Sequence, residues 1–308
     1  MSTGGVDSRR VVFSWVMLAP FMVLFLVFVV YPLIQSAFLA ANQTFGPGTR
    51  TFVGTKNFEL LISDPVFWKA IRNTFIYALG SLFVQLPIAF LLSLALNSPK
   101  LRGRGIYRLI FFSPQLMGLV FVSILGALAF EKRAGLINQA LDAAGINDLL
   151  VWITGNDAWL EPDWLQQHVM ATLILISLWL YVGFNMIYFL AALQSVDKSL
   201  LEAAEIDGAG PWGKLRHVIF PSVKPVATFV ILLSMIGSLQ LFELPYILLE
   251  SSGGPDNKGL TIVMYLYQNG FDLGDLGFAS AIGWVLALIL IGLALVQVKL
   301  TRAQEVNA

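Results

Sequence analysis

The chain is most informative at Ser199-Leu-Leu-Glu-Ala-Ala-Glu-Ile-Asp-Gly-Ala-Gly-Pro-Trp212. Ser199 followed three residues later by Glu202 matches a capping box, which predicts that a helix begins about there. Strong helix formers follow, and Gly208 suits a left-handed helix stop. Pro211 suits the first position of another helix. The stretch therefore predicts two helices joined by a sharp glycine turn.

The second helix is expected over 212–220, because Pro221 should interrupt it. The first helix, about two turns long, is too short to be stable alone and must pack on another surface. Ala203, Ala204 and Gly208 leave its surface flat enough for another protein to approach closely. The stretch is therefore interpreted as a docking element for a soluble partner, with an amphipathic helix on the lipid surface as the alternative.

Composition independently indicates a membrane protein. Hydrophobic residues make up 57% of the chain and charged residues 12%, against roughly 45–50% and 25% in ordinary soluble domains. There is no cysteine, which excludes disulfides and thiolate metal ligands. Apolar runs long enough to cross about 30 Å of hydrocarbon lie near 13–41, 73–97, 109–130, 168–192, 226–249 and 277–298. We therefore expect an all-α polytopic membrane protein with about six transmembrane helices.

Lysine and arginine residues are distributed unequally between the two sides of these spans. They precede the first span, crowd the connection after the second, recur in the loop after the fourth and follow the last. Positive residues concentrate on the cytoplasmic side of membrane proteins, so both termini are expected in the cytoplasm. The chain is therefore expected to consist of a cytoplasmic tail at 1–12, a transmembrane domain at 13–298 and a cytoplasmic tail at 299–308. Within the transmembrane domain, we expect an external loop at 131–167 and a cytoplasmic loop at 193–225.

Polar residues align along one face of the fourth and fifth spans. Tyr181, Asn185 and Tyr188 recur at helical spacing in the fourth span. Ser234, Ser238 and Leu241 repeat that spacing in the fifth. Both stripes predict a substrate cavity, although small and hydroxyl residues also serve ordinary helix packing in lipid. On this assignment, Leu173 and Val230 are expected to face the lipid.

Three other classes of protein are less consistent with the sequence. The chain has no phosphate-binding loop of the ATPase type, and its two histidines lie in no metal-binding cluster, so we expect no enzyme activity. An ion-coupled secondary transporter remains the alternative, because Glu243 lies inside an expected span. A single carboxylate is too few ionisable groups for a typical proton relay. A purely structural scaffold would not explain the polar stripes.

The external loop at 131–167 contains six acidic residues together with Trp152, Trp159 and Trp164. Tryptophan near the end of a span commonly anchors the chain at the membrane interface, and we expect this role for Trp164. The remainder is long and polar enough to fold as a small cap.

The order of motifs in the central loop resembles a known family signature. Glu202-Ala203-Ala204, three residues, Gly208, nine residues and then Val218-Ile219-Phe220-Pro221 resemble the signature loop of membrane subunits of binding-protein-dependent ABC importers. Val218 and Phe220 stand where that family usually has Ile and Leu. Further matches from about residue 11 to about residue 300, such as Gly103-Arg-Gly-Ile-Tyr-Arg108 and Gly253-Gly-Pro255, resemble carbohydrate-uptake permeases of the maltose and glycerol-phosphate type.

The resemblance implies an ABC-importer permease fold in the cytoplasmic (inner) membrane of a prokaryote. It implies a second homologous permease chain, an extracytoplasmic solute-binding protein and two ATPase subunits that hold ATP and Mg, with no cofactor in this chain. The binding protein would meet the external loop and the turn at Gly253. The substrate would be a sugar or polyol, with glycerol phosphate left open. The residues implied for ATPase coupling are Glu202, Ala203, Ala204, Asp207, Gly208 and Pro221. Those implied for substrate are Leu180, Tyr181, Phe184, Ser234, Gly237, Ser238 and Leu241, to which the polar stripe adds Asn185.

Overall fold

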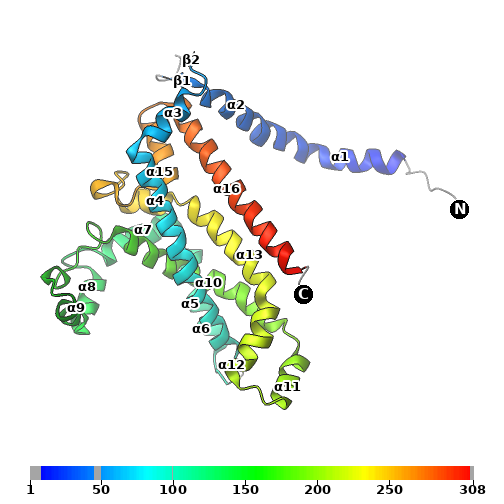
Figure 1. Ribbon diagram of the computed structural model, residues 1–308, viewed down its shortest axis with the longest axis vertical. Coiled ribbons are helices and arrows are strands. Elements are labelled where there is room, and N and C mark those ends of the chain that lie inside the picture. The colour runs from blue at the N-terminus through cyan, green and yellow to red at the C-terminus, as the bar shows by residue number, and fades with distance from the viewer. Residues whose placement is uncertain (1–7, 45–49, 99, 306–308) are drawn as a thin grey trace. The chain divides into compact units, whose positions relative to one another are not determined.

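The computed structural model describes residues 8–44, 50–98 and 100–305 of the chain, so the outermost parts of both expected tails, 1–7 and 306–308, lie outside it. Within the described residues, five helical segments are long and apolar enough to cross a membrane, and a bent helix pair makes a sixth (Figure 1). The five are Phe13–Ala40, Pro65–Asn97, Val169–Gln194, Pro211–Leu248 and Leu276–Lys299. The expected polytopic helical architecture is confirmed.

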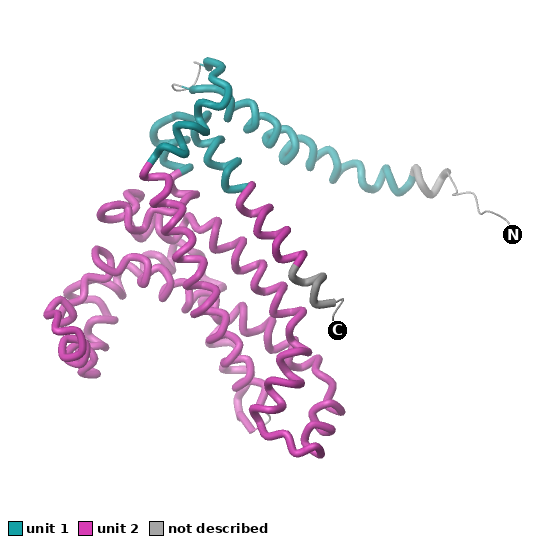
Figure 2. The backbone as a smooth tube through the Cα atoms, in the orientation of Figure 1, with its two compact units in different colours: residues 1–64, 266–287 teal, residues 65–265, 288–308 magenta. Residues whose placement is uncertain are grey.

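The chain divides into two compact units, residues 1–64 with 266–287 and residues 65–265 with 288–308 (Figure 2). The first unit contains a short hairpin that the sequence did not reveal, in which Asn42 pairs with Phe52. The Thr44 hydroxyl donates to Asp275 and accepts from the Gly277 amide, which ties the hairpin to the start of α16. The elements of this unit are α1 (Ser8–Phe25), α2 (Tyr31–Ala40), β1 (Asn42–Thr44), β2 (Arg50–Phe52), α3 (Lys56–Ser63) and the first part of α16 (Leu276–Glu305).

Helix α10 (Val169–Gln194) lies at the centre of the second unit and packs on α5, α6 and α13. A Cβ atom at Gly183 would lie 1.9 Å from the Phe111 carbonyl oxygen, so the close approach of α10 to α6 requires glycine. Leu173 and Val230 are 0% and 1% exposed, so the expectation that they face lipid is wrong. Other elements of this unit are α4 (Pro65–Gly80), α5 (Leu86–Asn97), α6 (Arg104–Leu116), α13 (Phe220–Leu239), α14 (Glu243–Leu248) and most of α15 (Ile262–Tyr267).

The third expected span, 109–130, is not one straight helix. It consists of α6 and α7 (Leu119–Ala129), which meet at an angle of 99°. Met117 and Gly118 between them both have extended backbone conformations, with ψ of 139° and 144°. Two consecutive extended residues end the hydrogen-bonded helix, and the chain leaves in a new direction.

The expectation that Pro221 ends a helix is also wrong, because the chain passes from α12 (Pro211–Lys214) into α13 through a π-helical turn at Leu215–Ile219. In this turn the Phe220 amide donates to the Leu215 carbonyl, five residues back. The wider turn accommodates a proline ring that would otherwise clash with the carbonyl four residues back. Pro32 and Pro87 follow π-helical turns at Leu26–Val30 and Ser81–Gln85 with the same two-residue spacing.

Candidate functional site

The central loop at 193–225 contains the expected first helix, α11 (Lys198–Ile206), but the cap differs from the prediction. Asp197 is the N-cap, and its carboxylate accepts a hydrogen bond of 2.9 Å from the Ser199 amide. Hydrogen bonds from the backbone and side chain of Ser199 lower the pKa of the Asp197 carboxyl. An aspartate binds the free amides of a helix start more strongly than a serine hydroxyl, because it is charged.

Gly208 forms the sharp turn after α11, with φ of +80° as expected. The Gly208 amide donates to the Glu205 carbonyl and the Ala209 amide to the Ala204 carbonyl, which is the hydrogen-bond pattern of a Schellman motif. Pro211 then begins α12, and Lys214 of α12 forms a 3.0 Å ion pair with Glu205. The predicted pair of helices joined by a glycine turn is confirmed.

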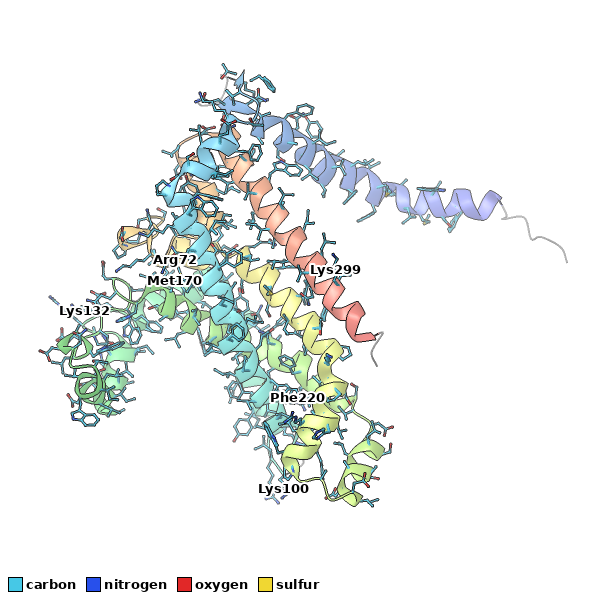
Figure 3. The ribbon with its side chains drawn as sticks, viewed as in Figure 1. Arg72, Lys100, Lys132, Met170, Phe220 and Lys299 are labelled. Carbon is cyan, nitrogen blue, oxygen red and sulfur yellow. The ribbon has the colours of Figure 1, made fainter. Side chains whose placement is uncertain are left out.

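The helices around this turn present an uncovered surface. No residue of α11 is buried. Ile206 and Trp212, on either side of Gly208, are 88% and 69% exposed. Of the residues predicted to couple to an ATPase, Ala204 is half-buried and the rest are exposed: Glu202, Ala203, Asp207, Gly208 and Pro221. Figure 3 marks Lys100 and Phe220 at the α11–α12 end of the second unit, away from Arg72 at the other end of its helices.

A cavity of about 180 Å³ lies inside the second unit, between α4, α10 and α13. It brings together seven of the eight residues predicted for substrate: Tyr181, Phe184, Asn185, Ser234, Gly237, Ser238 and Leu241. Leu180 does not line the cavity, because its side chain is buried in an adjacent apolar cluster with Leu173 and Leu244. The faces of α10 and α13 that carry the polar stripes are therefore the faces that meet.

The third wall of the cavity was missed by sequence reasoning. It consists of Tyr77, Ser81 and Gln85, from α4 and the π-helical turn that follows it. Ser81 Oγ donates to Gln85 Oε1 over 3.1 Å, and Gln85 Nε2 donates to Ser177 Oγ of α10 over 2.7 Å. Tyr77, Ser81 and Gln85 recur at i, i+4 and i+8, a helical spacing close to the i, i+4, i+7 spacing that revealed the stripes in the fourth and fifth spans.

The lining is uncharged and combines polar groups with apolar ones. Tyr77, Tyr181 and Phe184 provide aromatic rings, and Gln85 and Asn185 provide amide groups. Ser81, Ser234 and Ser238 add hydroxyls, and no charged residue is among the described residues that line the cavity. Such groups can stack on C–H surfaces and exchange hydrogen bonds with hydroxyls, but they offer no counter-charge for an ion.

Glu243, on which the ion-coupled alternative depended, is not part of this lining. It is the first residue of α14 and follows the non-helical break at Gln240–Phe242 that ends α13. Its side chain is exposed, so it does not extend the polar walls into a buried proton pathway.

The loop at 131–167 folds as the expected cap, with α8 (Leu136–Ala143) and α9 (Ile146–Thr154) at its centre. Asn138 is 7% exposed and donates to the carbonyls of Lys132 and Pro162. Its Oδ1 accepts a 2.6 Å hydrogen bond from Trp164 Nε1. Trp164 is half-buried, and its polar end is satisfied within the cap, so its expected role as a membrane anchor stays a prediction.

The turn at Gly253 is held by contacts to α4 and to the turn that precedes α10. Lys69 of α4 forms a 3.0 Å ion pair with Asp256, and Asn73 donates to the Asn257 carbonyl. Lys258 Nζ donates to the Gln166 carbonyl just before α10. Glu250, Ser251, Asp256 and Asn257 all have positive φ, a conformation that side-chain-bearing residues rarely adopt. These contacts hold the turn in a single strained shape.

Comparisons with known proteins agree with this architecture. Residues 8–304 match the model of the family described as binding-protein-dependent transport system inner membrane component. The chain is similar to the lactose transport system permease protein LacF of Rhizobium radiobacter, with 36% identity over 295 residues, 95% of each protein. It is also similar to the arabinooligosaccharides transport system permease protein AraP of Bacillus subtilis, with 36% identity over 92% of this chain and 86% of that protein.

A solved structure shares the fold. A chain of a bacterial ABC transporter involved in the import of the acidic polysaccharide alginate superposes with a TM-score of 0.77, at 25% identity and 96% coverage of both chains. The sequence match extends from the first described helix to the last, so it includes every membrane-spanning segment and the α11–α12 turn. This chain is a multi-pass inner membrane protein that belongs to the family of permease components of binding-protein-dependent ABC transport systems.

Proposed function

We propose that this permease subunit carries a neutral sugar or related polyol through the cavity between α4, α10 and α13. The single observation that carries the proposal is the lining itself, which combines aromatic rings, amides and hydroxyls without a charged group. A sugar presents C–H surfaces to rings and hydroxyls to polar side chains, so it satisfies both parts of the lining. The relatives named for lactose and arabinooligosaccharides support a sugar.

The same lining argues against glycerol phosphate. A phosphate group is normally bound by arginine, lysine or several backbone amides. None of the described lining residues is basic. An anionic substrate would therefore lose its hydration in this cavity without gaining a counter-charge.

The small volume of the cavity supports the proposal that a second permease chain completes the substrate path. Its volume of about 180 Å³ is below the roughly 300–1,000 Å³ of typical small-molecule sites. A second, homologous permease would supply the remaining walls of the path. The solute-binding protein would deliver substrate from the side of the external loop 131–167 and the Gly253 turn.

ATP hydrolysis would take place on two partner ATPase subunits, which bind ATP and Mg, so this chain needs no cofactor of its own. Their docking surface would be the exposed α11–α12 turn, with Glu202, Asp207 and Gly208 near its centre. Closure of the ATPases would favour one orientation of the cavity over the other, which is alternating access. On this proposal the α11–α12 turn is cytoplasmic, and reporter fusions after Arg104 and Lys214 should behave as cytoplasmic.

Two substitutions in the cavity test the proposal. Tyr181→Ala removes a ring that can lie on a sugar face, and Ser238→Leu fills polar space with an apolar side chain. Each should lower uptake about ten- to a hundredfold, because losing one such contact costs on the order of 1–3 kcal/mol when a polar partner is left unsatisfied. Uptake in intact cells and ATPase activity of the purified complex would be measured, with binding-protein affinity expected to be unchanged.

Ile187→Ala is the matched control, because Ile187 is on the same helix but is 39% exposed on its outer side and does not line the cavity. Normal uptake in both cavity variants, with loss of uptake in Ile187→Ala, would place the substrate path elsewhere. Uptake that persists without the ATPase subunits and collapses with a proton ionophore would instead establish the ion-coupled alternative.

A further inference from the structure

Helix α9 has an apolar face that is left uncovered. Trp152 is 81% exposed, Ile153 62%, Leu149 52% and Ile146 38%. At about 100° per residue these four side chains fall within an arc of about 120° on one side of the helix. The other side carries the buried Asn147, with Leu150 and Val151 half-buried beside it. The helix thus uses one side to pack into the cap and leaves an equally apolar side free.

Helix α9 itself lies beside the membrane-spanning helices. The loop that contains it is connected at one end to α7, part of the bent span, and at the other to α10. Figure 1 shows α8 and α9 at the far end of α7, to the side of the group formed by α4, α5, α10 and α13. A segment that is tethered between two spans and lies beside them is held close to the lipid surface.

The charges of the cap indicate what kind of contact this face makes. Residues 134–167 contain no lysine or arginine, and their charged residues are Asp142, Asp148, Asp157, Glu161 and Asp163. The arc from Leu149 through Trp152 to Ile146 contains no charged side chain, and Asp148 lies next to its edge. An attraction to anionic lipid is therefore absent, and the contact must be apolar. Tryptophan is one of the two residue types enriched where hydrocarbon meets the headgroups.

We propose that α9 lies in the plane of the membrane interface, with Leu149, Trp152 and Ile153 inserted at the boundary between headgroups and acyl chains. The contact holds the cap on the membrane surface next to α7. A docking site for a soluble protein that arrives and departs would expose this apolar face to water between visits, which soluble surfaces avoid. Lipid covers it continuously, as it does for other in-plane amphipathic helices.

The absence of cysteine allows a direct test, because Trp152→Cys introduces the only thiol of the chain. The variant, assembled with its partner subunits in phosphatidylcholine vesicles, would be spin-labelled and its collisions with oxygen and with a neutral nickel complex compared. Oxygen concentrates in lipid and nickel in water, so the label at 152 should favour oxygen. Asp148→Cys on the same helix, outside the apolar arc, is the matched control and should favour nickel.

Leu149→Cys and Ile153→Cys should repeat the result at 152, which guards against a local effect of removing the tryptophan. Equal nickel access at 148 and 152 would overturn the proposal. So would nickel protection at 152 that appears only after the solute-binding protein is added, because the face would then be a protein interface. Replacing part of the phosphatidylcholine by anionic phosphatidylglycerol should not increase oxygen access, and a clear increase would contradict an apolar contact.

Discussion

The loops at 193–225 and 131–167 both connect membrane-spanning helices through a pair of short helices, but different interactions hold them. In the first, the bonds join residues close in sequence, such as the Ala209 amide and the Ala204 carbonyl. In the second, the buried Asn138 joins backbone carbonyls as distant as that of Pro162. Short-range bonds fix the turn between α11 and α12, whereas the α8–α9 cap is held by the buried Asn138 and by Ile137 and Trp164, which pack on an apolar cluster of α7, α10 and α14.

This difference fits different mechanical roles. The α11–α12 turn is a stiff local structure because the Schellman motif and the ion pair of Glu205 with Lys214 fix it, while its outer surface remains free. Such a turn can pass a partner's movement to the connected spans without deforming. The cap instead depends on a few buried polar groups, so its shape should be lost as a unit when one of them is removed.

Of the substitutions that separate the two loops, Asn138→Ala should have the largest effect, on the folding of the cap at 131–167. The substitution leaves the Lys132 and Pro162 carbonyls and Trp164 Nε1 without their partner. A buried polar group left unsatisfied costs about 1–3 kcal/mol, so the loss should be enough to open the cap. Limited proteolysis of the purified complex should then cut within 131–167 much faster than in the wild type.

Gln139→Ala is the matched control, since Gln139 is exposed and donates only an exposed hydrogen bond to the Ala134 carbonyl. Proteolysis at 131–167 that is equally slow in Asn138→Ala and the control would show that the cap does not depend on its buried amide. The loop at 193–225 should be cut at the same rate in all three proteins, because none of these bonds reaches it.

A smaller effect, confined to the other loop, should follow from Gly208→Val. The φ of +80° at Gly208 is strained for any side chain, and holding such a residue there costs on the order of 1–3 kcal/mol. The turn should relax, and uptake and binding-protein-stimulated ATPase activity should become uncoupled while membrane insertion is normal. Gly210→Ala is the control, because Gly210 has φ of −67° and open space around its Cα. Wild-type uptake in Gly208→Val would mean that the turn transmits no motion.

The features that the sequence predicted correctly depend on short-range or periodic patterns. The turn at Gly208 and the start of α12 at Pro211 follow from the backbone preferences of those two residues. The cavity-facing sides of α10 and α13 follow from helical periodicity, which placed Tyr181 and Ser238 toward each other. These patterns need no knowledge of the remainder of the chain.

The features that were missed depend on contacts between distant segments. Gln85 becomes part of the cavity because its amide meets Ser177 of α10, ninety-two positions away. The indole of Trp164 is half-buried against the cap, where Asn138 accepts its N–H. Leu173 and Val230 are buried because neighbouring helices cover their sides of α10 and α13. Periodicity identifies a face of a helix but not what packs against it.

The smallest effect should come from the cap of α11. Asp197→Ala removes the acceptor for the Ser199 amide, so the first turn of α11 should exchange its amide hydrogens faster, with little change in uptake. Asp207→Ala is the matched control, because Asp207 lies at the opposite end of α11, where the helix dipole does not favour a carboxylate.

The same cap should make the start of α11 sensitive to pH. The folded-state pKa of Asp197 is lowered, so the stabilisation that its carboxylate gives to α11 is complete above the ordinary aspartate pKa of about 4 and is lost as the pH falls through the lowered value. Exchange in the first turn, corrected for the intrinsic rate, should therefore rise at acidic pH in the wild type but not in Asp197→Ala. An equal rise in both proteins would show that another group caps the helix.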